Sequence, residues 1–155
     1  MRKRVVLIAT ALSLVALLAL AGAALAQGNK IQSTGSGTVT LDREGGAPDQ
    51  ATGTARFTLD EKAAGYNSLK VKLTTDQLLP EAGKVYQVWL RDTDTDHNDS
   101  VATFQTDNDG NRTLTATETI PHFAQYDEIV VTTEDQNDED PTLNGEVVLR
   151  GDISN

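Results

Sequence analysis

The sequence predicts an all-β protein, an antiparallel β-sandwich (immunoglobulin-like or related) of about eight strands. Short stretches in which apolar and polar residues alternate recur along residues 37–155. Such alternation is typical of strands that place one face on a core and the other in water. The connections between these stretches are short, which favours antiparallel pairing at sandwich-like spacing. No long helical repeat of apolar residues appears in this part of the chain.

The N-terminal segment, residues 1–26, has the three parts of an export signal. Basic residues at positions 2–4 precede an apolar run, and the small residues Ala24-Leu25-Ala26 predict cleavage before Gln27. The apolar run is also long enough to remain uncut as a membrane anchor, which is the alternative. Both predict a protein that is secreted or held at the extracytoplasmic face of the cell membrane, with membrane contact only if the segment is uncleaved.

The predicted domain begins after a flexible leader at residues 27–36, which are polar and rich in Gly, Ser and Thr. Its first three strands are expected at residues 38–43, 52–60 and 68–75. In the second of these, Ala55, Phe57 and Leu59 alternate with polar neighbours. This period of two indicates a half-buried strand.

The fourth strand, residues 84–91, is apolar on both faces. Tyr86, Val88 and Leu90 fall on one side, and Val85 and Trp89 on the other. A strand with two apolar faces is covered on both sides. We therefore expect a central strand, with Tyr86 and Trp89 buried.

The remaining strands are expected at residues 101–106, 112–119, 128–133 and 146–150. The first two are joined by a turn at residues 107–111, where Gly110 supplies the positive φ that a tight hairpin requires. Residues 120–126 contain Pro121 and are expected to form a connection.

Composition limits the partners. The chain has 13 basic and 23 acidic residues and a net charge of −10. Three of the basic residues lie in the export signal. So acidic a surface repels nucleic acid and anionic lipid, and it favours cations and basic partners. The sequence has no cysteine, so disulfides, thiolate metal sites and thiol nucleophiles are excluded.

One acidic stretch, residues 92–99, suggests a calcium site, because calcium prefers six to eight oxygen ligands. Its spacing does not match an EF-hand loop, since His97 stands where Gly is required and Thr103 where Glu is required. A second acidic stretch, residues 134–140, would contribute only if both lie at the same end of the sandwich. The expected ligands are Asp92, Asp94, Asp96 and Asp99.

No catalytic group is predicted. Ser36 lacks the strand-to-helix elbow of a nucleophilic serine, and His97 and His122 lack the spacing of a zinc site. A carboxylate pair for a small secreted hydrolase remains an alternative. Asn98 and Asn111 begin glycosylation acceptor patterns, which matter only in a host with that machinery.

Three stretches in the second half carry a family resemblance. The first is Tyr86-x-x-Trp89-Leu90, and the second is Ala102-x-Phe104 followed by Asp109-Gly110. The third is Val131-Thr-x-Glu134, followed by Pro141-Thr142 and a Val-x-Leu-x-Gly ending at Gly151. Together and in this order they resemble the extracytoplasmic C-terminal domain of anti-sigma-K-factor-type proteins.

The resemblance implies an exported, non-enzymatic binding or sensing module. Members of that family usually carry a cytoplasmic sigma-binding domain before a membrane helix, whereas only residues 1–4 precede the apolar segment here. We therefore expect no anti-sigma activity from this chain itself, and an envelope protein or peptide as partner. The alternatives are a calcium-stabilised structural envelope module and a small secreted hydrolase.

Overall fold

The structure is a computed structural model that describes residues 35–62, 66–138, 140 and 142–153. The predicted export signal and most of the predicted leader lie outside these residues. The described part forms eight strands and one short 3-10 helix, in the order β1 (Gly35–Arg43), β2 (Thr52–Glu61), β3 (Tyr66–Asp76), β4 (Lys84–Asp92), β5 (His97–Phe104), β6 (Arg112–Pro121), η2 (Phe123–Gln125), β7 (Glu128–Asp135) and β8 (Glu146–Asp152). None of its helices has the length and apolar character needed to cross a bilayer.

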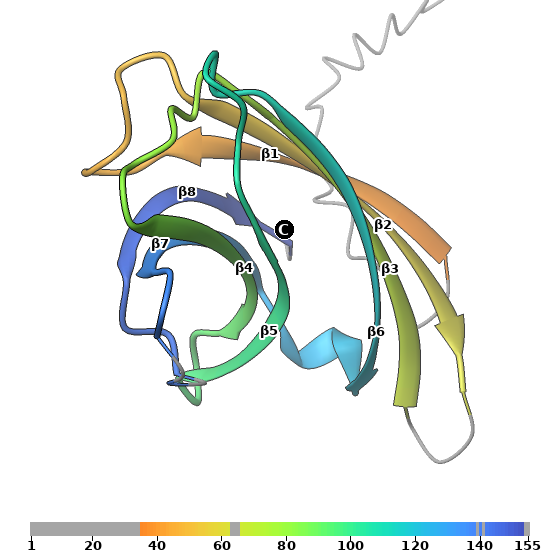
Figure 1. Cartoon of the computed structure of the whole chain (residues 1–155). Coiled ribbons are helices and arrows are strands. Elements are labelled where there is room, and N and C mark those ends of the chain that lie inside the picture. The colour runs from red at the N-terminus through yellow and green to blue at the C-terminus, as the bar shows by residue number, and fades with distance from the viewer. Residues whose placement is uncertain (1–34, 63–65, 139, 141, 154–155) are drawn as a thin grey trace, which may run out of the picture.

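All strand pairs are antiparallel, in the order β5-β4-β7-β8-β1-β2-β3-β6. The sheet curls so that its two halves face each other (Figure 1). The halves are joined at β1, whose first part pairs with β2 while Asp42 and Arg43 at its end pair with β8. The predicted eight-stranded, antiparallel all-β fold is confirmed.

The core lies between the two halves of the sheet. Alternate residues of the strands point into it, as the period of two in the burial patterns of β2 and β3 shows. Phe123 of η2 closes one end of this core, with its ring 5.9 Å from that of Phe57 and 6.2 Å from that of Tyr126. The aliphatic core includes Leu41, Leu69, Leu73, Leu90, Ile129 and Leu149.

The predicted two-faced character of β4 is confirmed. Val88 and Leu90 belong to the core, whereas Trp89 lies on the opposite face of the sheet and is still only 1% exposed. Its indole Nε1 donates a hydrogen bond to Oγ1 of Thr132 at 2.9 Å, and that hydroxyl donates to Oε1 of Glu134 at 2.5 Å. Trp89 is therefore held by a buried polar chain on the outer face of the sheet.

Several strand boundaries differ from the expectation by a few residues, and β1 begins at Gly35, within the predicted leader. β5 begins at His97, four residues before the predicted start, because residues 97–100 pair with the end of β4 despite their polar side chains. Ile120 and Pro121 belong to β6, where they pair with Asn67 and Tyr66. In both places backbone pairing with a neighbouring strand, which hydropathy does not record, decides where the strand ends.

Candidate functional site

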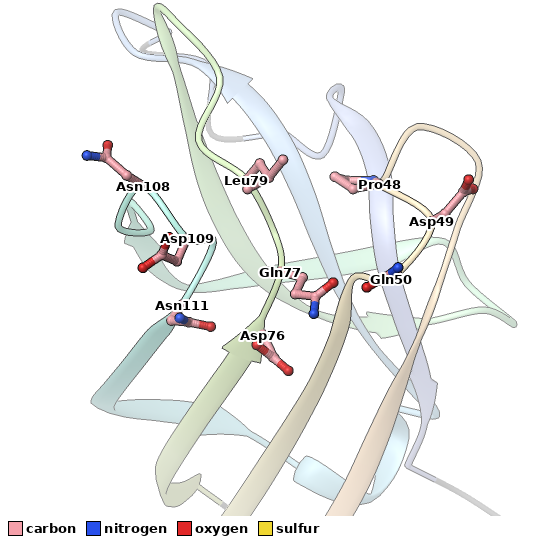
Figure 2. A pocket seen from close by; sticks show the side chains of 9 residues that line it. All are labelled: Pro48, Asp49, Gln50, Asp76, Gln77, Leu79, Asn108, Asp109 and Asn111. Carbon is pink, nitrogen blue, oxygen red and sulfur yellow. The ribbon is translucent and has the colours of Figure 1, made fainter.

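Three loops meet at one end of the sheet and enclose an open cleft. They are the β1–β2, β3–β4 and β5–β6 connections, and the cleft has a volume of about 650 Å³. Figure 2 shows its lining side chains around the opening. They are Pro48, Asp49, Gln50, Asp76, Gln77, Leu79, Asn108, Asp109 and Asn111.

The β5–β6 loop forms one wall of the cleft. The hairpin predicted here is wrong, because β5 pairs with β4 and β6 with β3, so the turn connects the two opposite edges of the sheet. The Asp107 carboxylate accepts hydrogen bonds from the backbone N–H groups of Asp109 and Asn111, at 3.0 and 2.8 Å, which closes the turn locally. Gly110 has a φ of 81°, in the left-handed region that favours glycine. Its carbonyl accepts a hydrogen bond from the N–H of Leu78 at 3.0 Å, which joins this wall to the next one.

The β3–β4 loop forms the second wall. Gln77 has a φ of 56°, so the chain turns sharply after β3. Leu78 is then fully buried, while the next residue, Leu79, is 47% exposed. The hydroxyl of Tyr86 donates a hydrogen bond to the carbonyl of Leu79. One leucine thus anchors the loop in the core and the other is presented at the cleft.

The β1–β2 loop forms the third wall and contains two tight turns. The N–H of Ala47 donates to the carbonyl of Glu44, and the N–H of Ala51 donates to the carbonyl of Pro48, each at 3.0 Å. Ala47 and Ala51 are buried, which fixes the loop on the core. Asp49 is exposed at its tip, with its carboxylate 3.3 Å from the guanidinium of Arg43.

The charged side chains that line the cleft are acidic, although one of them, Asp49, already pairs with Arg43. Asp49, Asp76 and Asp109 supply carboxylates, four carboxamide side chains alternate with them, and the lining set contains no basic residue. Leu79 adds an exposed apolar contact. Carboxylates and amide oxygens accept hydrogen bonds from ammonium or guanidinium groups. The cleft is therefore suited to a cationic group that lies beside an apolar one.

Tyr86, which holds the β3–β4 loop, makes stability sensitive to alkaline pH. Burial raises the pKa of its hydroxyl to about 12, from an ordinary value of 10.0. Because the folded-state pKa lies above the unfolded one, the tyrosine contributes stability below pH 10 that is lost as the pH rises toward 12. We expect the free energy of unfolding to fall over this interval, and to fall less in Tyr86→Phe. The matched control is Tyr66→Phe, since Tyr66 is 48% exposed.

Chemical unfolding at pH 9 and pH 11.5 measures the effect. Tyr86→Phe costs stability at pH 9, because the carbonyl of Leu79 loses its donor. We therefore compare, between variants, how far the free energy of unfolding falls from pH 9 to pH 11.5. An equal drop in Tyr86→Phe and in the unmodified protein would show that Tyr86 is not responsible.

The four aspartates predicted to bind calcium lie around the β4–β5 turn, away from the cleft. Oδ1 of Asp92 accepts hydrogen bonds from the N–H groups of Asp94 and Thr95, and Oδ2 accepts one from the Thr95 hydroxyl at 2.7 Å. The Thr95 hydroxyl, followed by these backbone donors, holds the pKa of Asp92 below its usual range. This carboxylate therefore closes the turn from within.

Asp96 and Asp99 have different partners. Asp96 lies 3.1 Å from the guanidinium of Arg91, and Asp99 accepts a hydrogen bond from the hydroxyl of Tyr126 and lies 3.4 Å from Nε2 of His97. Within the described ranges, no group of three or more His, Asp or Glu side chains is placed to hold a metal ion. The calcium site stays a prediction.

The two acidic stretches do not lie at the same end of the sheet. In the antiparallel β4–β7 pair, Lys84 faces Asp135 and Arg91 faces Glu128. The stretch that follows β4 is therefore at the opposite end from the stretch that follows β7. The sequence left open a joint metal site formed by both stretches. The pairing register places them at opposite ends of the sheet, so they do not form one.

The two histidines also lie apart from the cleft. His97 begins β5, and its ring stacks on that of Tyr126 at 6.2 Å. His122 precedes η2 with a φ of 40°. The potential glycosylation sites differ in position, because Asn98 lies in β5 and Asn111 lines the cleft.

Sequence reasoning did not identify the cleft. Its lining residues come from three loops that are distant along the chain, and the motif that one of them carries, Asp109-Gly110, indicated only a turn. Two local signals were present. They are the adjacent leucines Leu78 and Leu79 in an otherwise polar loop, and the Asp-Asn-Asp-Gly-Asn turn that ends at Asn111.

The fold is that of a small all-β domain with a cleft built from three loops. A family model described as "Anti-sigma-K factor rskA, C-terminal" matches residues 6–147. The chain therefore belongs to this family, as the motifs around Trp89 and Glu134 predicted. Comparisons with curated proteins and with solved structures find no match.

Proposed function

We propose that this chain is an exported, non-enzymatic module that binds an envelope protein or peptide in the cleft between its three loops. It acts on the extracytoplasmic side of the membrane or in the secreted state. Its partner presents a basic side chain next to an apolar one. The observation that carries this proposal is a cleft of about 650 Å³ whose lining combines three carboxylates with an exposed leucine.

Family membership supports the proposal, since the matching model is that of the C-terminal part of an anti-sigma factor. The construction of the cleft supports it as well. Each wall is held by backbone hydrogen bonds or by a buried residue, as Leu78 and Ala51 illustrate. The exposed lining side chains are therefore presented on fixed loops, which reduces the entropy lost when a ligand binds.

The test is capture of partners from the host envelope, comparing the unmodified chain with a variant that carries Asp49→Asn, Asp76→Asn and Asp109→Asn. We expect the variant to lose at least about tenfold in affinity for any partner that uses the cleft, because three charge-assisted contacts are weakened. Higher salt should weaken binding to the unmodified chain in the same direction. Asparagine has nearly the shape of aspartate and is tolerated in loops, where Asp49 and Asp109 lie, and at the exposed end of β3, where Asp76 lies, so we expect the fold to be retained.

The matched control carries Asp42→Asn, Asp60→Asn and Glu61→Gln. These residues are exposed and lie outside the cleft lining, and the change in net charge is the same. We expect this control to bind like the unmodified chain. Equal loss in both triple variants would assign binding to overall charge, and no loss in either would overturn the cleft as the binding site.

A further inference from the structure

The two strands at the ends of the sheet differ in how they are protected. β5 and β6 are the outermost strands in the pairing order, so each has one hydrogen-bonded neighbour (Figure 1). In β5, Ala102 faces Val88 while Ser100 faces Trp89, which leaves Val101 as an extra residue in a bulge. Bulges of this kind protect an edge from pairing with other chains.

β6 has no such protection. It pairs with β3 in unbroken register along Arg112–Pro121, without a bulge. Its nine residues before Pro121 include no glycine, proline or lysine, and four of them are threonines, a residue favoured in strands. All four are exposed. A long, regular and exposed edge strand is a template for a further strand.

Pro121 shows which backbone groups of β6 are free. It faces Tyr66 of β3 and has no N–H, so this pair cannot be one in which both residues exchange hydrogen bonds. Hydrogen-bonded and non-hydrogen-bonded pairs alternate in an antiparallel ladder. The odd-numbered residues Thr113, Thr115, Thr117 and Thr119 therefore direct their N–H and C=O groups away from β3, to the open edge.

We propose that β6 pairs with β6 of a second copy of this chain, antiparallel and centred on Thr115. In this register Thr115 faces Thr115 of the other copy, and Thr113 faces Thr117 on either side. All of these residues present their free backbone groups to the edge. Each such pair exchanges two hydrogen bonds, so the two curled sheets become continuous across a two-fold axis.

Charge complementarity selects the second copy as the occupant and sets the register. Centring on Thr115 places Arg112 of each copy opposite Glu118 of the other, and Leu114 opposite Ala116. These are non-hydrogen-bonded pairs, in which the side chains approach most closely. Within the described residues neither Arg112 nor Glu118 has an ion-pair partner in its own chain. A shift of the two-fold centre by one residue would place Glu118 against Leu114.

The absence of natural cysteine makes a direct test possible. In the proposed pairing the two Thr115 α-carbons are about 5.5 Å apart, within the range that a disulfide spans. Thr115→Cys in the full-length chain, purified in mild detergent and oxidised, should give mainly a covalent dimer on a non-reducing gel. The matched control is Thr113→Cys on the same strand and face. Its two copies would lie about 13 Å apart along the strands and should remain largely uncrosslinked.

A charge exchange tests the partner residues. Arg112→Glu and Glu118→Arg should each weaken the dimer at least about fivefold in a sedimentation experiment, because each places like charges opposite each other. The double variant restores opposite charges and should recover the dimer. A purely local effect of either substitution would not be reversed by the other.

Three outcomes would overturn the proposal. The first is a monomeric unmodified chain at all concentrations, which would leave β6 to a strand from a different protein. The second is equal crosslinking of Thr113→Cys and Thr115→Cys, which would indicate random collision. The third is a double charge variant no better than either single one. None of these measurements involves the cleft, so they are independent of the proposed ligand site.

Discussion

Trp89→Ala is expected to lower the free energy of unfolding by about 3–5 kcal/mol, the usual cost of removing a large buried aromatic side chain. The indole is 1% exposed, and it donates to the hydroxyl of Thr132, which in turn donates to Glu134. Truncation therefore leaves a cavity, and it also removes the N–H that donates a hydrogen bond to the buried hydroxyl of Thr132. Both effects destabilise in the same direction.

Trp89→Phe separates these two contributions. Phenylalanine retains most of the apolar bulk but has no N–H, so we expect a loss of about 1–3 kcal/mol. Denaturant unfolding followed by far-ultraviolet circular dichroism is the measurement, since Trp89 is the only tryptophan and its fluorescence is lost in both variants. Leu79→Ala is the surface control and should change stability by less than about 1 kcal/mol. A loss below about 1 kcal/mol in Trp89→Ala would show that the ring is not structurally buried.

Gly110→Ala is expected to destabilise the chain by about 2–5 kcal/mol and to abolish the proposed binding at the cleft. The left-handed φ of 81° costs a residue with a β-carbon about 1–2 kcal/mol. The added carbon would also lie 2.5 Å from the backbone nitrogen of Leu78 and 2.6 Å from the carbonyl carbon of Gln77. Backbone atoms cannot rotate away, so the two walls of the cleft must separate, at a further cost of about 1–3 kcal/mol.

Gly45→Ala provides the matched control. Nothing lies within 4 Å of a β-carbon at Gly45, and its φ is not in the left-handed region. We expect its stability to lie within about 0.5 kcal/mol of the unmodified chain, with binding retained. The measurements are the same unfolding experiment and the capture assay used for the cleft. If Gly110→Ala matched Gly45→Ala in both, the close contact between the β5–β6 loop and the β3–β4 loop would not be required.

Much of the fold follows from local sequence. The alternation of Ala55, Phe57 and Leu59 predicted β2 and its buried face. Gly110 predicted the turn after β5, but the predicted hairpin is wrong, because β5 pairs with β4 and β6 pairs with β3. The two apolar faces around Trp89 predicted a strand paired on both sides. Each of these signals is local, because side-chain period and turn conformation are properties of a few consecutive residues.

The candidate site was less accessible to such reasoning. The calcium prediction rested on the spacing of Asp92, Asp94, Asp96 and Asp99, but spacing along a chain does not say which oxygens are already engaged. In the structure, the carboxylate of Asp92 accepts a hydrogen bond from Thr95 of its own turn, and the carboxylate of Asp99 accepts one from the hydroxyl of Tyr126. The register of β4 with β7 separates the two acidic stretches, and register depends on pairing between distant strands.

The sequence by itself determined the all-β class, the position of the strands within a few residues, and the family through motifs such as Tyr86-x-x-Trp89-Leu90. Only the tertiary structure decided that loops near Asp49, Leu79 and Asp109 enclose one cleft, and that β6 is left as an edge strand without a bulge. The physical reason is that alternation specifies which face of a strand is buried. Strand order, and with it the loops and edges that become neighbours, is set by long-range packing of the whole sheet.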